Sequence, residues 1–177
     1  MRKVDFRSQN GFEQITALVL IALGVVFRVL PHPDNFTPVT AIAVFSGVTL
    51  SPALAFTVPL IVMMASDLLI GPHPLFWLVW ATFVLVTWLG QAVRAKNDLL
   101  PVAFATLGGS ALFFVLTNLG VFLFQDMYPK SAAGLVECFA LALPFFRNSL
   151  AGDFFYTAVL FLIFELARRG ARAVRQN

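Results

Sequence analysis

Long apolar stretches with few charged residues recur along this chain of 177 residues. They cover about residues 12–30, 38–50, 52–70, 75–93, 101–124 and 148–167. A helix needs about 20 such residues to cross the roughly 30 Å hydrocarbon layer of a bilayer. Because 59% of the residues are apolar and only 12% are charged, a water-soluble globule and a disordered chain are both excluded. We predict an all-α integral membrane protein, a six-helix transmembrane bundle that forms a single domain over residues 1–177.

Proline and glycine mark the predicted ends of these segments. Ser51-Pro52 separates the second segment from the third, and Gly71-Pro72-His73-Pro74 ends the third. The second and third segments together are too short for two full crossings, so at least one must be short, tilted or shielded. For residues 125–147 we predict an outer loop with a short helix, which could lie at the interface or act as a lid.

The basic residues predict the orientation of the chain in the membrane. Most of them lie at the two ends and at the junction between the fourth and fifth segments, namely Arg2, Lys3, Arg7, Arg94, Lys96, Arg168, Arg169, Arg172 and Arg175. Six crossings place all of these on one side, which the positive-inside rule assigns to the cytoplasm, so we expect both termini there. They form no basic stripe, and we therefore expect no nucleic-acid partner.

Polar residues gather at the opposite end, in or beside the outer connections 31–37, 70–74 and 125–147. Ionisable groups at membrane depth usually face the protein interior and pair with one another. We therefore predict an outward-facing polar cup over an apolar floor. The candidate substrate-binding residues are Arg28, His32, Asn35, Asp67, His73, Asn118, Tyr128, Arg147, Asn148, Asp153 and Tyr156.

Two interpretations are open for each of three residues with reactive side chains, Asp67, Asp153 and Cys138. Asp67 needs a partner, and either forms a fixed ion pair with Arg28 or Arg147 or contacts a ligand. Asp153 shares one helix face with Ser149, as part of a buried polar seam or of the pocket lining. Cys138 either packs as a small buried residue or brings its sulfur to a soft metal, such as cobalt, that a ligand carries.

Several motifs are missing from the chain. It has no Gly-x-x-x-x-Gly-Lys loop, no Gly-x-Ser-x-Gly elbow and no His-Glu-x-x-His helix, so neither nucleotide-driven work nor standard hydrolysis is expected. Without His-x-x-His or Cys-x-x-Cys spacing, we expect no metal and no cofactor. The expected roles are passive conduction, capture of a ligand for a separate motor, or scaffolding.

The predicted architecture resembles the substrate-binding S components of energy-coupling factor vitamin transporters. The resemblance implies that the three outer connections build the binding site. Local motifs are similar to those of a small bacterial membrane-protein family of unassigned function that is often grouped with S components. These motifs are residues 35–47 (NFTPVTAIAVFSG), 66–71 (SDLLIG), 128–130 (YPK), 144–148 (PFFRN) and Gly152-Asp153. Both resemblances imply a multi-pass protein of the bacterial cytoplasmic (inner) membrane.

The first segment bears on the expected partners. S components that share a coupling subunit tend to carry Ala-x-x-x-Ala in their first helix, but here Ala17 is followed at that spacing by Ile21, and Ala22 by Val26. Two arrangements therefore remain. The protein could work with a transmembrane coupling subunit and its ATPases, or it could work alone. The resemblance to S-component-like cobalamin carriers, which work alone and ligate cobalt through a cysteine, implies the second arrangement.

The function that we expect is that of a membrane transporter or substrate-capture subunit. Its partners would be the lipid bilayer and a small vitamin-like molecule, and a cobalamin-type ligand is one candidate for that molecule. The alternatives are an intramembrane enzyme that uses Asp67 and Asp153, and a ligand-free membrane scaffold.

Overall fold

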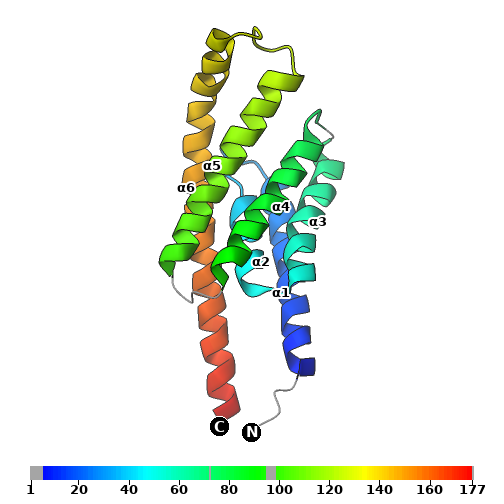
Figure 1. Ribbon diagram of the computed structural model, residues 1–177. Helices are drawn as coiled ribbons and strands as arrows, with labels where there is room; N and C mark the ends of the chain where they lie inside the picture. The colour runs from blue at the N-terminus through cyan, green and yellow to red at the C-terminus, as the bar shows by residue number, and fades with distance from the viewer. Residues whose placement is uncertain (1–5, 72, 95–98, 177) are drawn as a thin grey trace.

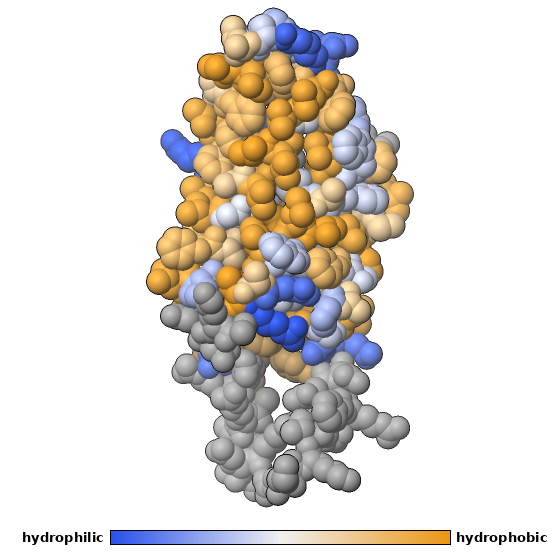
Figure 2. All heavy atoms as spheres, in the orientation of Figure 1, coloured by the Kyte–Doolittle hydropathy of each residue, from blue (hydrophilic) through white to orange (hydrophobic). Residues whose placement is uncertain are grey.

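The computed structural model describes residues 6–71, 73–94 and 99–176. All regular structure in these ranges is helical and confirms the predicted six-helix bundle (Figure 1). The helices are α1 (Phe6–Val29), α2 (Val39–Thr49), α3 (Pro52–Ile70), α4 (Phe76–Val93), α5 (Leu99–Phe124) and α6 (Ala132–Gln176). Five of the helices in the described part, all except α2, are long and apolar enough to cross a membrane. Apolar residues cover most of the face seen in Figure 2, as expected of a multi-pass membrane protein.

The short helix α2 forms the centre of the bundle. It has 11 residues and is about 16 Å long at 1.5 Å per residue, which is too short to cross the hydrocarbon layer alone. Residues 39–47 are all buried, and α2 contacts each of the other five helices. The second apolar segment is therefore the shielded one.

Two glycines let α2 and α4 approach to backbone contact. A Cβ atom on Gly47 would collide with the backbone of Thr87, and one on Gly90 would collide with the backbone of Val44. Small residues allow such close crossings between membrane helices. Around this crossing, buried apolar side chains of α2, α3, α4 and α5 form a continuous cluster, which includes Val44, Val62, Met63, Phe83, Val86 and Val102.

The structure differs from the predicted outer loop with a short helix over residues 125–147. Residues 132–147 are the first part of α6, which continues through Pro144 to Gln176. The turn before it is well fixed: the Lys130 ammonium donates to the backbone carbonyls of Phe122 and Gln125 at the end of α5, and the Gly134 amide donates to the Ser131 hydroxyl at 3.2 Å. These bonds satisfy helix ends that would otherwise lack partners.

Aromatic packing joins this part of the chain to α5. Phe114 of α5 contacts Phe139 and Phe146 of α6, with ring centroids 5.5 and 4.6 Å apart. Gly134 packs closely against the backbone of Pro129. At the end of the bundle where the α5–α6 turn lies, the α5–α6 hairpin extends beyond the α3–α4 turn (Figure 1).

The helix ends define two ends of the molecule. α1 begins and α6 ends at the same end (Figure 1), and α4 also ends there, followed by Arg94. We call the opposite end, with residues 30–38, 71–75 and 125–131, the outer end. The predicted basic residues Arg2, Lys3 and Lys96 lie outside the described residues.

Candidate functional site

A pocket of about 270 Å³ lies at the outer end, between α4, α5 and α6. We call it the outer pocket. All three outer connections contribute to it, and its lining residues are Asn35, His73, Pro74, Leu75, Val79, Phe113, Phe114, Thr117, Asn118, Val121, Gln125, Ala142, Phe145, Phe146 and Ser149. Most of the wall is apolar, with four phenylalanines and a few amide and hydroxyl groups. No Lys, Arg, Asp or Glu belongs to this set.

Local hydrogen bonds orient the polar groups that α5 supplies to the outer pocket. The Thr117 hydroxyl donates to the Phe113 carbonyl at 2.6 Å, and the Asn118 Nδ2 amide donates to the Phe114 carbonyl at 2.7 Å. The amide oxygen of Asn118 remains as an acceptor. Asn35 reaches the outer pocket from the first outer connection with a φ of 60°, in the left-handed region that Asn adopts more readily than most residues. The walls thus combine ring faces with amide groups that can bond a ligand.

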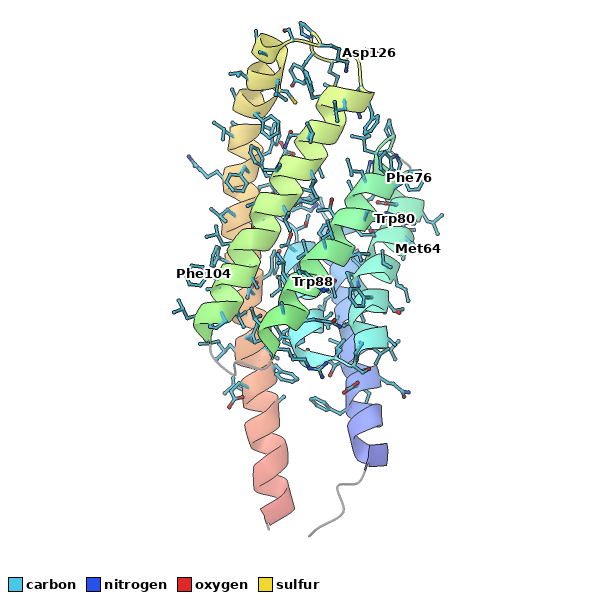
Figure 3. The ribbon with its side chains drawn as sticks, viewed as in Figure 1. Met64, Phe76, Trp80, Trp88, Phe104 and Asp126 are labelled. Atoms are coloured by element: carbon cyan, nitrogen blue, oxygen red, sulfur yellow. The ribbon has the colours of Figure 1, made fainter. Side chains whose placement is uncertain are left out.

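A buried ion pair lies beside the outer pocket. The Arg28 guanidinium of α1 donates to the Asp67 carboxylate of α3 at 2.6 Å and to the Ser66 hydroxyl at 2.5 Å. Asp67 is only 7% exposed, and the indole N–H of Trp80, labelled in Figure 3, donates to its second oxygen at 2.8 Å. Of the two readings for Asp67, the structure shows the fixed ion pair, and its partner is Arg28.

His73 connects this ion pair to the outer pocket. Its ring lines the pocket, while its Nε2 atom lies 4.0 Å from the Asp67 carboxylate. With Nε2 turned toward Asp67, Nδ1 is the ring nitrogen available to a ligand. His73 therefore lies next to both the ion pair and the outer pocket.

Asp153 belongs to a second buried polar cluster. Its carboxylate accepts a hydrogen bond from the Ser110 hydroxyl of α5 at 2.7 Å, and the Thr40 hydroxyl of α2 is a further hydrogen-bonding partner. One turn along, the hydroxyls of Thr106 and Thr157 lie 3.3 Å apart. Of the two readings for Asp153, the structure shows the buried polar seam, since Asp153 itself does not line the outer pocket.

Comparison with known proteins identifies the family. A model of a family of unknown function, DUF6580, matches residues 8–174. The chain belongs to DUF6580. Searches of the curated proteins and of the solved structures found no match. The family agrees with the predicted likeness to membrane proteins of unassigned function, while the likeness to S components stays a prediction.

In this DUF6580 chain, three of the predicted site residues line the outer pocket: Asn35, His73 and Asn118. Arg28 and Asp67 form the adjacent ion pair, and Asp153 lies in the separate cluster. Sequence reasoning missed the four pocket phenylalanines, which carry no signal in a chain with 20 phenylalanines. Only the arrangement of α5 against α6 distinguishes these four rings from those that face lipid.

The other predicted residues do not line the outer pocket. His32 places its ring nitrogens near the backbone carbonyls of Pro33 and Arg28, and Tyr156 packs its ring against Phe27 and Phe36. Tyr128 is in the α5–α6 turn, Arg147 is exposed on α6, and Asn148 is half-buried.

Cys138 is buried in this DUF6580 chain, and its thiol lies 3.5 Å from the Asn118 carbonyl. It does not line the outer pocket. Packing, the first of its two readings, is what the structure shows, and a contact with ligand-borne cobalt gains no support from this position.

Proposed function

We propose that this protein captures a small vitamin-like molecule in the outer pocket and mediates its uptake across the bacterial cytoplasmic membrane. The observation that carries the proposal is the composition of the outer pocket, to which all three outer connections contribute. A concave apolar site with a few convergent polar groups is the usual form of a small-molecule site. The S-component resemblance assigns the same three connections to substrate binding.

The walls of the outer pocket favour one class of ligand. Four phenylalanine rings and several amides suit a flat molecule with hydrogen-bonding edges, and the set contains no acidic or basic side chain other than His73 to balance a ligand charge. The volume of about 270 Å³ is near the lower limit of the roughly 300–1,000 Å³ typical of drug-sized ligands. This favours a compact vitamin-like molecule over a cobalamin-type ligand, which is several times larger than a drug.

The direction of uptake follows from the charges. Arg94 and the helix positions of Arg168, Arg169, Arg172 and Arg175 lie at the end opposite the outer pocket. The positive-inside rule places this end in the cytoplasm, so the outer pocket faces outward. The protein would either receive energy from a coupling subunit with ATPases or carry the molecule alone, without such a subunit.

Binding is favoured over catalysis by the positions of the two carboxylates. An intramembrane enzyme would use Asp67 and Asp153, but neither lines the outer pocket. Asp67 is held by Arg28 and Trp80, and Asp153 is only 2% exposed. A proton donor or acceptor must lie within hydrogen-bonding reach of its substrate.

Native mass spectrometry of the full chain in lipid nanodiscs tests this proposal. We expect a non-covalently bound small molecule to co-purify with the wild type and to be lost from Phe146→Ala, which removes one wall of the outer pocket. A buried aromatic contact is worth about 1.5–3 kcal/mol, so the Kd of the released compound should rise by about tenfold or more.

The matched control is Phe104→Ala, because Phe104 is also a phenylalanine in the long hairpin but is 64% exposed and points away from the bundle (Figure 3). It should retain the compound. An empty wild-type protein that also fails to respond to a vitamin library would support a scaffold, and turnover of the bound compound would support an enzyme. Either result contradicts the proposal.

A further inference from the structure

Asp153 is a buried carboxyl group in the middle of a membrane helix, and the outer pocket does not account for it. It is 2% exposed, and its partners are the Ser110 hydroxyl of α5 at 2.7 Å and the Thr40 hydroxyl of α2. Three helices therefore meet around one carboxyl group. Ionisable residues at membrane depth are costly and usually serve binding, relay or coupling of ions.

No positively charged side chain balances Asp153 among those described. α2 and α5, which pack against α6 and hold the partners of Asp153, contain no acidic, basic, histidine, cysteine or tyrosine residue. α1 also packs against α6, through Phe27 on Tyr156, and carries Arg28 next to this contact. On α6 the neighbouring titratable group is Tyr156, whose ring packs against Phe36. Arg28 is bound to Asp67, and Lys130 is at the α5–α6 turn. A charge buried without a partner is strongly unfavourable, so any positive charge at Asp153 must come from a bound cation.

The hydrogen bonds around Ser110 suit a proton. Its hydroxyl oxygen lies 2.7 Å from Asp153 Oδ2 and 3.0 Å from the Thr106 carbonyl, but a hydroxyl has one hydrogen. When Ser110 donates to Thr106, the hydrogen in the contact with Asp153 must come from the carboxylic acid. When Ser110 donates to Asp153, the carboxylate needs no hydrogen of its own. The same atoms therefore accommodate both states through a hydroxyl rotation.

A metal ion fits this cluster less well. Hydroxyls are the only side-chain partners that the structure gives to the single carboxylate. No group of three or more His, Cys, Asp or Glu residues that could hold a metal exists among the residues that the structure describes. Hard cations such as calcium or magnesium take six or more oxygen ligands. A proton needs only the contact that is already present.

The cluster lies directly below the outer pocket. Ser149 precedes Asp153 by four residues on α6, and Phe113 follows Ser110 by three on α5, and both line the pocket. Four residues correspond to about 6 Å along a helix. In the other direction, the Thr106–Thr157 contact is followed by apolar residues such as Val102, which is buried. The nearest pocket residues on α5 and α6 therefore lie about one helical turn from the cluster.

We propose that Asp153 is a proton-binding site that exchanges its proton with water through the outer pocket. On uptake, a proton adds to the carboxylate, the new O–H donates to Ser110, and the Ser110 hydroxyl rotates to the Thr106 carbonyl. Release returns the proton to pocket water and reverses the rotation. The inference does not depend on the identity or transport of a ligand, and it gives the protein a means of sensing or using a proton gradient.

Infrared difference spectroscopy of the full chain in nanodiscs tests the site. Acidification should produce the C=O stretch of a protonated, buried carboxylic acid. Asp153→Asn should abolish this band, whereas Asp126→Asn should retain it, because Asp126 is fully exposed at the α5–α6 turn (Figure 3). If Asp153→Asn fails to fold, Ser110→Ala supplies the second test and should shift the band. A band that is absent, independent of pH, or unchanged in both variants overturns the proposal.

The route is tested by the rate at which the acid proton exchanges in D₂O. Val79 lines the outer pocket, so Val79→Trp should partly fill the pocket and slow exchange several-fold. Leu85→Trp, on the same helix but exposed, should leave the rate unchanged. Equal rates in the wild type and in both variants would overturn access through the pocket.

Discussion

At the scale of single residues, Asp67 and Arg28 form the buried ion pair beside the outer pocket. Their side chains are 8% and 17% exposed, and Trp80 supplies a further donor to Asp67. Asp67→Asn leaves the Arg28 charge without its partner, and breaking such a pair costs about 3–5 kcal/mol. We expect a loss of unfolding free energy near the lower value, because Arg28 retains some solvent. Unfolding by SDS in mixed micelles measures it.

The exposed pair between Lys130 and Asp126 at the α5–α6 turn is the control for this prediction. Asp126→Asn should leave the unfolding free energy unchanged, because exposed ion pairs contribute little. The double variant Arg28→Gln/Asp67→Asn should be more stable than Asp67→Asn alone, since no unpaired charge remains. If the wild type and Asp67→Asn had equal unfolding free energies, the contact between Arg28 and Asp67 would not contribute to stability.

At the scale of helices, the crossing of α2 and α4 depends on Gly47. A Cβ atom there would collide with the backbone of Thr87 and lie 2.9 Å from the Gln91 amide, so Gly47→Ala must push the two helices apart. Overpacking of this kind costs about 1–3 kcal/mol. The same SDS unfolding measurement should therefore show a destabilised protein.

Gly108→Ala is the matched control on α5, because its Cβ atom would meet only Leu89 at 3.4 Å, an ordinary contact. Alanine is also the better helix former. This variant should be as stable as the wild type or slightly more stable. If Gly47→Ala were equally well tolerated, α2 would not be held by backbone contact with α4.

At the scale of the whole molecule, the arrangement of helix ends predicts the topology. α1 begins and α6 ends at one end, and the α5–α6 turn lies at the other. With Arg94 and the arginines of α6 at the first end, the positive-inside rule predicts cytoplasmic termini. A reporter fused after Asn177 should give a cytoplasmic signal, and one inserted at Asp126 an external signal. The reverse pair of signals would contradict both the topology and the outward-facing pocket.

Local chemistry made most of the helical architecture predictable. α3 begins at Pro52 and ends at Ile70, where proline and Gly71 interrupt the apolar pattern. Gly71 has a φ of 109°, a conformation that favours glycine and ends the helix. The polar outer connections were also recognisable, because backbone and charges at membrane depth must be satisfied inside the protein. Such signals depend only on neighbours in the sequence.

The tertiary structure alone decided which residues meet. The predicted ion pair left Arg28 and Arg147 open as partners of Asp67, and only the contact of α1 with α3 selects Arg28. Residues 132–147 contain enough polar and proline residues to suggest a separate element, yet packing of Phe139 and Phe146 on Phe114 joins them to α6.

The sequence by itself determined that this protein is a helical membrane bundle with a polar outer end, because hydrophobicity, charge and helix breaks act locally. The central position of α2, the four phenylalanines of the outer pocket and the hydroxyl partners of Asp153 were decided by tertiary packing. Lipid tails are as apolar as the helices, so hydrophobicity does not determine which helices pack together. Close backbone contacts and interhelical hydrogen bonds between residues far apart in the chain select the neighbours.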